Sequence, residues 1–411
     1  MSVNYDRREW RDFMIANWKE KVGGMKKSPV DPRDYQVSYK AISLPEEYNT
    51  NPSNYIHDQG SYNNCAAHAL SSYIEILLKS EDKFKEVSFP WLYGNRRHTT
   101  YKDEGLISRD LLKASQKDGN LYLEDYSKVE EMKAAMNTFN KSYLIFKDRA
   151  LKVKLGNYYQ CTTIQEVKEA IYKYGSCMIG TVLFDSFGKV ATGETLYMNE
   201  PIMEDDSLEP MVGGHMMLAV GWIKDYLIIQ NSWGTEFGKD GYFYMPFSLA
   251  TWNERTGFPI SVFEAWAIDG IYLNNEFVCF NKDLVDENEG KPEKTEFGWY
   301  QDSNDKWHYK LEDGKDAIGW LKDKNHWYFF ENNGEMVISK WVQSKDNRWS
   351  YLKPTGIAAC NQWFKINDRW YWFDDWCYAI KGFRSIDGVD YYFAERKFNN
   401  IKECECMISS K

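Results

Sequence analysis

The sequence predicts an α+β domain followed by an all-β solenoid of stacked hairpins. Upstream of residue 281, segments with helical periodicity alternate with short apolar strands. The stretch from 281, "NKDLVDENEGKPEKTE", offers charges, glycine and proline but almost nothing to bury, as a linker does. Downstream, aromatic residues recur about every 21 residues. A chain of 411 residues is also too long for one ordinary core.

The first region is expected to combine helices with short strands. Helices are expected at "AAHALSSYIEILLKS" and "IQEVKEAIYKYG", because apolar residues return there every three or four positions. Strands are expected at "MMLAVGWI", "YLIIQNSW" and "GYFYMP", which Gly and Asp interrupt. The expected division is an N-terminal extension (1–42), an α+β domain (43–275), an acidic linker (276–296), and a repeat region with a tail (297–411).

The composition excludes several classes of protein. A formal net charge of −10 leaves no basic stripe to neutralise phosphates, so no nucleic-acid partner is expected. No apolar run approaches the roughly 18 residues of a transmembrane helix, and the first residues lack the apolar core of a secretory signal. We expect synthesis in the cytoplasm without a signal peptide, and no membrane insertion.

The cysteines do not predict a disulfide scaffold or a metal site. Eight are scattered along the chain, at 65, 161, 177, 279, 360, 377, 404 and 406, and most are expected to be buried thiols. Cys404 and Cys406 in the tail "KECECMISSK" have no second pair at ligand spacing. We therefore expect a frayed terminus there, no metal and no cofactor.

Two aromatic series define the repeat. The first contains Trp299, Trp320, Trp341, Trp363 and Phe383, and the second follows seven or eight residues later at Trp307, Trp327, Trp349, Trp370 and Tyr391. The segments "WHYKLEDGK", "WYFFENNGE" and "WSYLKPTGI" then lead into turns centred on Gly314, Gly334 and Gly356, a pattern typical of hairpins. A single hairpin of about 20 residues cannot bury its aromatic face, so the copies are expected to stack.

The tryptophans of the repeats have two interpretations. Ten of the 17 tryptophans lie between residues 299 and 376, and some must simply form the core between hairpins. Trp is nevertheless a demanding filler, because its N–H needs a partner and its ring is seldom fully buried. Rings left at the joints can form cages for a quaternary ammonium, which ring quadrupoles hold within about 6 Å.

The pattern "GW…WYFF…GEM…KW" at 319–341 resembles the cell-wall-binding repeats of the choline-binding family, over about residues 297–394. The resemblance implies a partner, choline-decorated teichoic acid or a related wall polymer, and a homodimer formed through the repeats. Met336 holds the family's methionine position in one repeat, and "DDWCYAIKGF" lacks the usual glycine turn, so some cages are expected to be degenerate. The implied cages are Trp299, Trp307 and Trp327; Trp320, Trp327 and Trp349; Trp341, Trp349 and Trp370; and Trp363, Trp370 and Tyr391.

Cys65 is a candidate nucleophile because it stands where the polar run "QGSYNN" becomes the helix "CAAHAL". The first turn of a helix offers unpaired backbone N–H groups and the positive end of the macrodipole, and both favour a thiolate. The alternative is that a lone cysteine is a small core hydrophobe. A nucleophile also needs an imidazole to take its proton and a third group to orient that imidazole.

Among the six histidines, His215 in "GGHMMLAVGW" is the best candidate base, because two glycines give access to it and a buried strand follows. Asn231 lies 16 residues later in "QNSWGTEFGKDGYFYMP", where its amide can accept from the imidazole. His68 lies on the same helix as Cys65 and is expected to be a packed or capped histidine.

Gln59, Cys65, His215 and Asn231, in that order, resemble the papain family of cysteine peptidases over about residues 42–275. The resemblance implies a two-lobed fold, with a helical lobe carrying Cys65 and a β-rich lobe carrying His215 and Asn231. It also implies that Cys65 attacks, that His215 shuttles the proton, and that Asn231 fixes the imidazole under Trp233. The Gln59 side chain and the Cys65 backbone N–H are then the oxyanion hole.

The sequence also departs from that family. Tyr62 replaces a cysteine that is often disulfide-bonded, Ala66 replaces an aromatic residue, and Asn63 and Asn64 replace small residues. The N-terminal 42 residues are much shorter than the inhibitory propeptide of secreted relatives and do not match its motifs. We therefore expect no large propeptide and a peptidase that is competent as made.

The expected function is that of a cysteine endopeptidase targeted to the Gram-positive cell wall. Its substrates are then peptidoglycan peptides, for a phage or bacterial lysin, or wall-associated proteins. Lack of a signal peptide favours a phage-encoded or virion-associated protein. The alternative is a non-catalytic wall-binding adhesion or phage structural protein with a papain-like module. Transglutaminase or amidase chemistry also uses Cys and His, but the "NSWG" context favours a peptidase.

Overall fold

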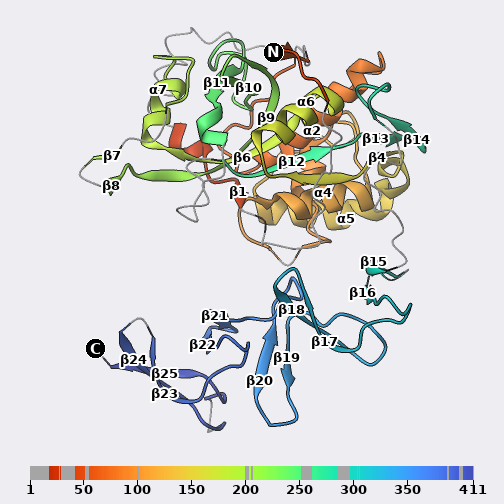
Figure 1. The fold of residues 1–411 in the computed structure, drawn as a ribbon. Helices are drawn as coiled ribbons and strands as arrows, with labels where there is room; N and C mark the ends of the chain where they lie inside the picture. Colours follow the sequence, from red (N-terminus) through yellow and green to blue (C-terminus); the bar gives the residue numbers. More distant parts are fainter. Residues whose placement is uncertain are drawn as a thin grey trace. The chain divides into compact units, whose positions relative to one another are not determined.

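The computed structural model describes residues 18–26, 28, 42–50, 55–99, 101–199, 203–204, 207–250, 262–285, 297–302, 304, 306–386, 388–397 and 401–410. Within these residues, the contacts divide the chain into a first unit up to 285 and a second unit from 297. Figure 1 colours the first unit from red to green and the second in blue tones. Among the described residues, no helix is long and apolar enough to cross a membrane.

The helices of the first unit are arranged around a buried helix, α2 (Cys65–Ser80), whose residues from Cys65 to Leu78 are all buried. The sequence predicted this helix and α6 (Ile164–Tyr174), and both are confirmed. A capping box of Thr163 and Glu166 starts α6, and Gly175 ends it in the left-handed conformation that glycine adopts without penalty. The other helices are α3 (Phe89–Gly94), α4 (Ser108–Asp118), α5 (Met132–Ala150) and α7 (Gly188–Ala191), with 3₁₀ turns η1 (Trp18–Lys21), η2 (Asp185–Phe187) and η3 (Phe247–Ala250).

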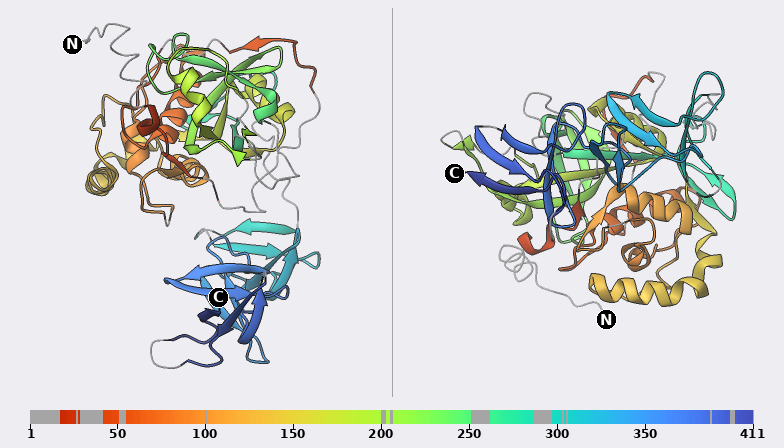
Figure 2. Two further views of the ribbon diagram at one scale, coloured as in Figure 1. Left: turned by 90° about the vertical axis from the view of Figure 1, so that its left-hand side faces the viewer. Right: turned by 90° about the horizontal axis from the view of Figure 1, so that it is seen from below.

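A seven-stranded antiparallel sheet forms the β-rich lobe, in the order β11-β10-β9-β6-β12-β5, with β2 paired to β9. Alternate residues of its longest strand, β9, enter two cores: Met216, Leu218 and Val220 pack with α2, and Met217 and Ala219 pack with α6. The two lobes adjoin in the left-hand view of Figure 2, with helices in orange and strands in green. The strands are β2 (Tyr48–Asn49), β5 (Tyr158–Cys161), β6 (Cys177–Phe184), β9 (Met211–Ile223), β10 (Tyr226–Gln230), β11 (Tyr242–Pro246) and β12 (Val262–Ile268).

Short strands complete the first unit, and they show that it extends beyond the predicted domain boundary at residue 275. β14 pairs with β13, which pairs with β4, and the Asn281 backbone N–H donates to the Lys173 carbonyl at 3.2 Å. The expectation that a linker begins at residue 276 is therefore wrong, because the chain is still paired and packed there. The short strands are β1 (Met25–Lys26), β3 (Leu106–Ile107), β4 (Val153–Leu155), β7 (Met203–Glu204), β8 (Ser207–Leu208), β13 (Ile271–Leu273) and β14 (Glu276–Val278).

In its described residues, the second unit contains five successive antiparallel hairpins (Figure 1), and the second residue of each first strand is a member of the first aromatic series. This confirms the predicted all-β repeat region. The hairpins are β15–β16 (Gly298–Gln301, Trp307–Lys310), β17–β18 (Gly319–Asp323, His326–Phe330), β19–β20 (Lys340–Gln343, Trp349–Leu352), β21–β22 (Gln362–Ile366, Arg369–Phe373) and β23–β24 (Gly382–Ile386, Val389–Phe393).

The predicted turns at Gly314, Gly334 and Gly356 exist, but they do not join the two strands of each hairpin. They follow the second strand, and the strands themselves are joined by tighter turns such as Lys324–Asn325, both with positive φ. Successive hairpins are linked by backbone hydrogen bonds after the glycine turns: Met336 donates to Trp307 and Ala358 donates to Trp327. These bonds stack each hairpin on its predecessor, as a solenoid requires.

The cysteines of the second unit differ from expectation. Cys360 and Cys377 form a disulfide. Cys377 lies in the segment "DDWCYAIKGF", which lacks the usual glycine, and with a φ of 64° it ends a turn that resembles the glycine turns of the other repeats. The tail is not frayed: β25 (Cys406–Ser410) pairs with β24, and Cys404 is buried in the core between hairpins. Through this pairing, the described part of the tail covers one edge of the hairpin β23–β24.

Candidate active site and aromatic sites

Cys65 is the first residue of α2 and is fully buried. Burial raises the pKa of its thiol to about 12, although backbone groups of Met216, Ala66 and Cys65 itself act in the opposite direction. The sequence predicted that the helix terminus stabilises a thiolate at Cys65. In this structure the loss of solvation on burial has a larger effect on the pKa, so the thiol form is favoured. The backbone contact with Met216 places the thiol beside β9, next to His215.

The sheet brings His215 and Asn231 together. His215 lies on β9 and Asn231 follows β10, which pairs with β9, and the His215 Nε2 lies 2.8 Å from the Asn231 Oδ1. Burial lowers the pKa of His215 to about 4, while the bond to Asn231 acts to raise it. The His215 Nδ1 has no hydrogen-bond partner in the described part of the chain. Trp233 is fully buried, with its ring centroid 5.1 Å from that of His215, so the pair is sheltered from water.

Gln59 reaches the same place through a short backbone pairing between loops. Asp58 and Trp233 form an isolated antiparallel bridge, and the Gln59 N–H donates to the Ser232 carbonyl at 2.9 Å. The Gln59 Oε1 accepts from the Ser232 hydroxyl at 2.7 Å, which fixes the orientation of the amide. The Gln59 Nε2 then donates to the carbonyls of Tyr62 and Lys21, both at 3.0 Å. Gln59, Cys65, His215 and Asn231 thus lie in one buried site.

The other histidines of the first unit have structural partners. His68 stacks on Phe89 with ring centroids 3.8 Å apart, and burial lowers its pKa well below the usual value. The His57 Nε2 lies 2.9 Å from a Glu75 carboxylate oxygen. His68 therefore behaves as the packed histidine that the sequence analysis expected.

An N-terminal segment that the sequence analysis did not place in the site covers it. This segment, Trp18–Lys26 with Ser28, is called the strap below. Its Lys21 carbonyl accepts from Gln59, its Gly23 N–H donates to the Gly214 carbonyl at 2.9 Å, and its Gly24 carbonyl accepts from Leu106 at 2.8 Å. The strap therefore touches both lobes beside the candidate active site, at Gln59 and Leu106 in one lobe and at Gly214, the neighbour of His215, in the other.

The strap can pack this closely because glycines without a Cβ lie at its contacts with the helical lobe. A Cβ on Gly24 would lie 2.7 Å from the backbone carbon of Asn63, and one on Gly105 would lie 2.8 Å from the Gly24 carbonyl oxygen. The Gly-Gly pair in "VGGM" is the sequence signal that could have indicated this close approach. The expectation of a peptidase that is competent as made stays a prediction, and the packing of the strap argues against it.

The leading tryptophans of the second unit form perpendicular ring pairs within their own hairpins, and the complete cages stay a prediction. In four hairpins the leading Trp and its second-series partner lie 6.1–6.4 Å apart at 83–88°. These pairs are Trp299 with Trp307, Trp320 with Trp327, Trp341 with Trp349, and Trp363 with Trp370. Of the third rings expected, Tyr391 contacts Trp363 at 4.8 Å. Trp299 and Trp341 instead contact Tyr328 and Tyr371 of the next hairpin.

Met336 and the last leading residue differ from the tryptophan pairs. Met336 is buried in a core with Tyr328 and Phe330, and its sulfur lies 2.4 Å from where a Cβ on Gly356 would be. It therefore supports the joint between two hairpins. Phe383 is the most exposed of the leading aromatics, at 83 %, and contacts Tyr392 of its own hairpin.

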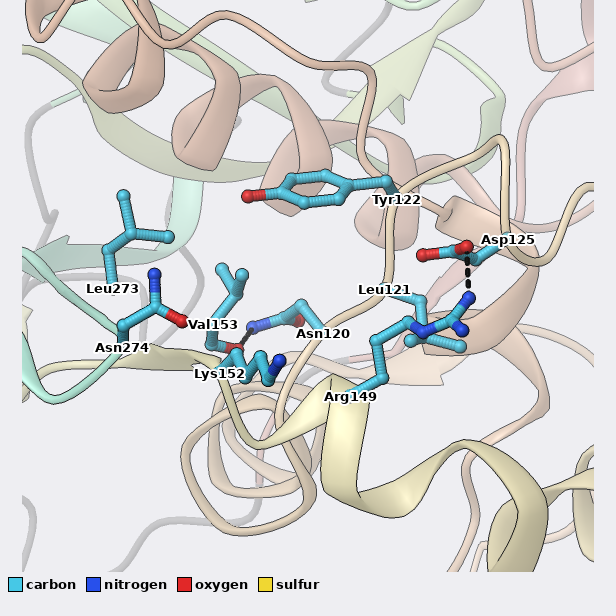
Figure 3. A pocket seen from close by; sticks show the side chains of 9 residues that line it. All are labelled: Asn120, Leu121, Tyr122, Asp125, Arg149, Lys152, Val153, Leu273 and Asn274. Carbon is cyan, nitrogen blue, oxygen red and sulfur yellow. Dashed lines mark hydrogen bonds and ion pairs between the residues drawn. The ribbon is translucent and has the colours of Figure 1, made fainter.

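A surface cavity of about 100 Å³ lies elsewhere, in the helical lobe. Figure 3 shows Asn120 bonded to Val153 beside it, and Arg149 paired with Asp125. Gln59, Cys65, His215 and Asn231 do not line this cavity, so it is separate from the candidate active site.

Comparison with known proteins agrees with this architecture. Residues 104–253 match the papain family cysteine protease, a range that includes His215 and Asn231 but begins after Cys65. Residues 298–341 match the choline-binding repeat, and residues 361–376 match a cell wall binding repeat. Xylellain, a cysteine protease from Xylella fastidiosa, has the same fold, with 24% identity, a TM-score of 0.50, and coverage of 60% of this chain and 96% of that chain.

Two curated proteins match different parts of the chain. An uncharacterized peptidase C1-like protein of Acanthamoeba polyphaga mimivirus is 28% identical over 206 residues, which are 46% of this chain and 63% of that protein. Glucosyltransferase-S of Streptococcus mutans is 29% identical over 103 residues, which are 24% of this chain and 7% of that protein. The chain therefore spans less than two thirds of these relatives. The comparisons therefore support a papain-family peptidase domain at residues 104–253, followed by choline-binding repeats between residues 298 and 376.

Proposed function

We propose that this protein is a cysteine endopeptidase held at the Gram-positive cell wall by its repeats. The observation that carries the proposal is the His215–Asn231 hydrogen bond, sheltered by Trp233 and adjacent to Cys65 at the start of α2. A thiol at a helix terminus beside an oriented imidazole is the arrangement that nucleophilic acyl transfer needs. The five aromatic hairpins in the same chain supply the wall-binding part.

The reaction follows from the positions of these groups. His215, held by Asn231 through Nε2, takes the Cys65 proton on its free Nδ1, and the sulfur attacks the peptide carbonyl. The Gln59 Nε2 and the Cys65 backbone N–H stabilise the oxyanion. His215 then protonates the leaving amine, and water hydrolyses the thioester with His215 as base. In the closed state the Lys21 carbonyl takes the hydrogen bond from Gln59 that the substrate carbonyl would take.

The proposed partner of the repeats is choline on teichoic acid or a related wall polymer. Perpendicular tryptophan pairs at about 6 Å offer two ring faces to a quaternary ammonium. The Cys360–Cys377 disulfide supports work outside a reducing cytoplasm. The substrate is either a peptidoglycan peptide or a wall-associated protein, the source is a phage or a bacterium, and a dimer through the repeats is part of the same proposal.

Digestion of purified choline-containing walls by the wild type and by Cys65→Ala tests this proposal, with released peptides and new amines identified by mass spectrometry. New peptide termini that appear only with the wild type support a wall-lytic peptidase and identify the bond. If both proteins bind the wall but neither releases peptides, wall-associated proteins are tested next as substrates.

A non-catalytic wall-binding role is the second candidate, and the strap favours it, because Cys65 and His215 are fully covered in this state. Casein digestion after mild proteolysis of the strap distinguishes the two functions. Hydrolysis that a thiol-alkylating inhibitor abolishes, without loss of wall binding, excludes the non-catalytic role. No hydrolysis of any substrate after removal of the strap overturns the peptidase.

A further inference from the structure

Two arginines that follow α3 are adjacent in sequence but have opposite surroundings. Arg97 is partly exposed, donates to the Asp118 carboxylate at 3.2 Å, and lies 3.8 Å from the centroid of the Tyr143 ring. Arg96 is only 4 % exposed, and its Nη1 donates to the Gly105 carbonyl at 2.7 Å. Its Nε and Nη2 are buried and have no hydrogen-bond partner among the described residues. The burial of Arg96 therefore needs an explanation that Arg97 does not.

Burying the Arg96 guanidinium works against the stability of the fold. Burial lowers the pKa of this guanidinium, while Tyr93 and nearby carboxylates such as Glu104 act in the opposite direction. Arginine nevertheless keeps its charge in proteins, and a buried charge with incomplete hydrogen bonding is costly. An apolar side chain of similar volume is often neutral or stabilising in such a place. The role of Arg96 is therefore better sought in what it holds than in the stability of the fold.

Arg96 holds a peptide group that pairs with the strap. The Gly105 carbonyl and the Leu106 N–H belong to one peptide group, and they point in opposite directions because the bond is planar and trans. The guanidinium bonds the carbonyl, and on the other side the Leu106 N–H donates to the Gly24 carbonyl of the strap at 2.8 Å. A charge-assisted hydrogen bond to the carbonyl also polarises the amide and strengthens its N–H as a donor. Arg96 thus affects both the direction and the strength of the bond that the Leu106 N–H makes.

Gly105 cannot position this peptide group by itself. It has a φ of 86°, and a Cβ on it would lie 2.8 Å from the Gly24 carbonyl oxygen, so no side chain fits there. Glycine populates more backbone conformations than other residues, so its surroundings have to select one. The Tyr93 hydroxyl, which donates to the Glu104 carboxylate at 2.7 Å, supports the preceding residue. Arg96 bonds the Gly105 carbonyl itself.

We propose that Arg96 is a positioning residue for the substrate backbone, because it directs the Leu106 N–H toward a carbonyl of the peptide that lies beside β3. In the closed state that peptide is the strap, and in the working enzyme it is the substrate. The proposal rests on the proposed peptidase function, because it assumes that substrate replaces the strap at the Leu106 N–H. Arg96 does not touch the reacting atoms and acts through the Gly105–Leu106 peptide group.

Alkylation of the full-length chain tests this role without requiring hydrolysis. Arg96→Met removes the guanidinium, Arg96→Lys keeps a charged donor, and Arg97→Met is the matched control. We expect iodoacetamide to alkylate Cys65 about fivefold faster in Arg96→Met than in the wild type, because the strap is held less firmly at Leu106. Arg96→Lys should recover part of this difference, and Arg97→Met should behave as the wild type. Mass spectrometry of the Cys65 peptide measures the rates.

Two buried thiols of the same unit, Cys161 on β5 and Cys177 on β6, distinguish positioning from a merely structural role. Their alkylation is measured in the same digests. Acceleration confined to Cys65 supports the proposal. Equal acceleration of all three thiols means that Arg96 only supports the fold, and it overturns the proposal. An unchanged Cys65 rate in Arg96→Met, or an equal acceleration in Arg97→Met, overturns it as well.

A second experiment connects Arg96 to hydrolysis. In a peptide substrate, each backbone carbonyl is replaced in turn by a thioamide, whose sulfur is a weaker acceptor. At one position we expect kcat/KM of the wild type to fall about fivefold, mainly through KM, and that of Arg96→Met to fall less than about twofold. Equal falls at every position overturn the role of Arg96 toward substrate and leave the peptidase standing. Absence of any Cys65-dependent cleavage overturns the peptidase, while the alkylation rates still decide whether Arg96 positions the strap.

Discussion

The two units expose their functional side chains to opposite degrees. Cys65 and His215 are fully buried beneath the strap, whereas Trp370 is 49 % exposed. A cysteine nucleophile and its histidine base work in a desolvated site, which has to open to admit substrate. A cation-binding site needs only aromatic rings that are already in position. If the proposed function holds, the first unit has to open before it acts, whereas the second unit already exposes the rings proposed to bind a cation.

The largest expected effect separates the two units. Cys65→Ala should reduce hydrolysis by at least about a thousandfold, because no other group replaces the nucleophile. Retention on a choline resin should be unchanged, because the aromatic pairs lie in the other unit. Parallel assays of peptide release and resin elution measure both properties. Loss of resin binding in Cys65→Ala would show that the two units do not act independently.

The buried imidazole predicts a pH dependence of the first unit. Burial lowers the pKa of His215 from 6.5 to about 4, so between these values the unfolded chain binds a proton that the folded chain does not. The stabilisation by neutral His215 is present above pH 6.5 and is lost as the pH falls toward 4, by about 3 kcal/mol. The raised pKa of Glu264 acts with the opposite sign, so a matched variant is needed.

Urea unfolding of the wild type and His215→Gln between pH 7 and 4 isolates this effect, followed by the helical circular dichroism signal, because the described helices lie in the first unit. The free energy of unfolding of the wild type should fall more steeply with decreasing pH than that of His215→Gln. Parallel pH profiles would contradict the burial of His215 in the closed state.

The strap can be opened by a single methyl group. Gly24→Ala places a Cβ 2.7 Å from the Asn63 backbone, and overpacking of this kind costs about 1–3 kcal/mol. We expect faster alkylation of Cys65 and, for a peptidase, higher initial activity. Gly188→Ala is the matched control, because its Cβ would meet the Trp18 ring at an ordinary 3.5 Å. Equal rates in Gly24→Ala and wild type would mean that the strap does not limit access.

The smallest expected effect tests the open sites of the second unit. Trp363 contacts Trp370 and Tyr391, whereas Phe383 contacts only Tyr392 among the described ring partners. Trp363→Ala should weaken choline binding by about 1–2 kcal/mol at its site, the usual size of a cation–π contribution, and Phe383→Ala should change it little. Calorimetric titration with choline compares the two. Equal losses would mean that the ring pairs do not define the sites.

Local patterns predicted much of this protein because they depend on near neighbours. The periodicity of 65–80 and 164–174 specified α2 and α6, and the aromatic spacing specified five hairpins. Cys65, His215 and Asn231 were proposed from helix-terminus chemistry, a glycine-flanked histidine and an amide on the next strand, whereas Gln59 was implied by the resemblance to the papain family. The third ring of each cage was harder to predict. The stacking of one hairpin on the next determines whether Trp327 or Tyr328 faces Trp299, and in this structure Tyr328 contacts it.

Features that join distant parts of the chain could not be predicted in this way. The Cys360–Cys377 disulfide and the pairing of β25 with β24 depend on which hairpin ends meet. The strap and Glu264 are more than 230 residues apart in sequence and meet at the Ser28 N–H.

By itself, the sequence determined the two kinds of unit and the chemical groups that each one offers, because side-chain type and periodicity are local properties. Only the tertiary structure decided the state of those groups. It buried Cys65 and His215 as a neutral pair under the strap, and it brought the Glu264 carboxylate to the backbone N–H of Ser28. Burial and charge are set by what surrounds a residue in space, and residues far away in the chain supply those surroundings.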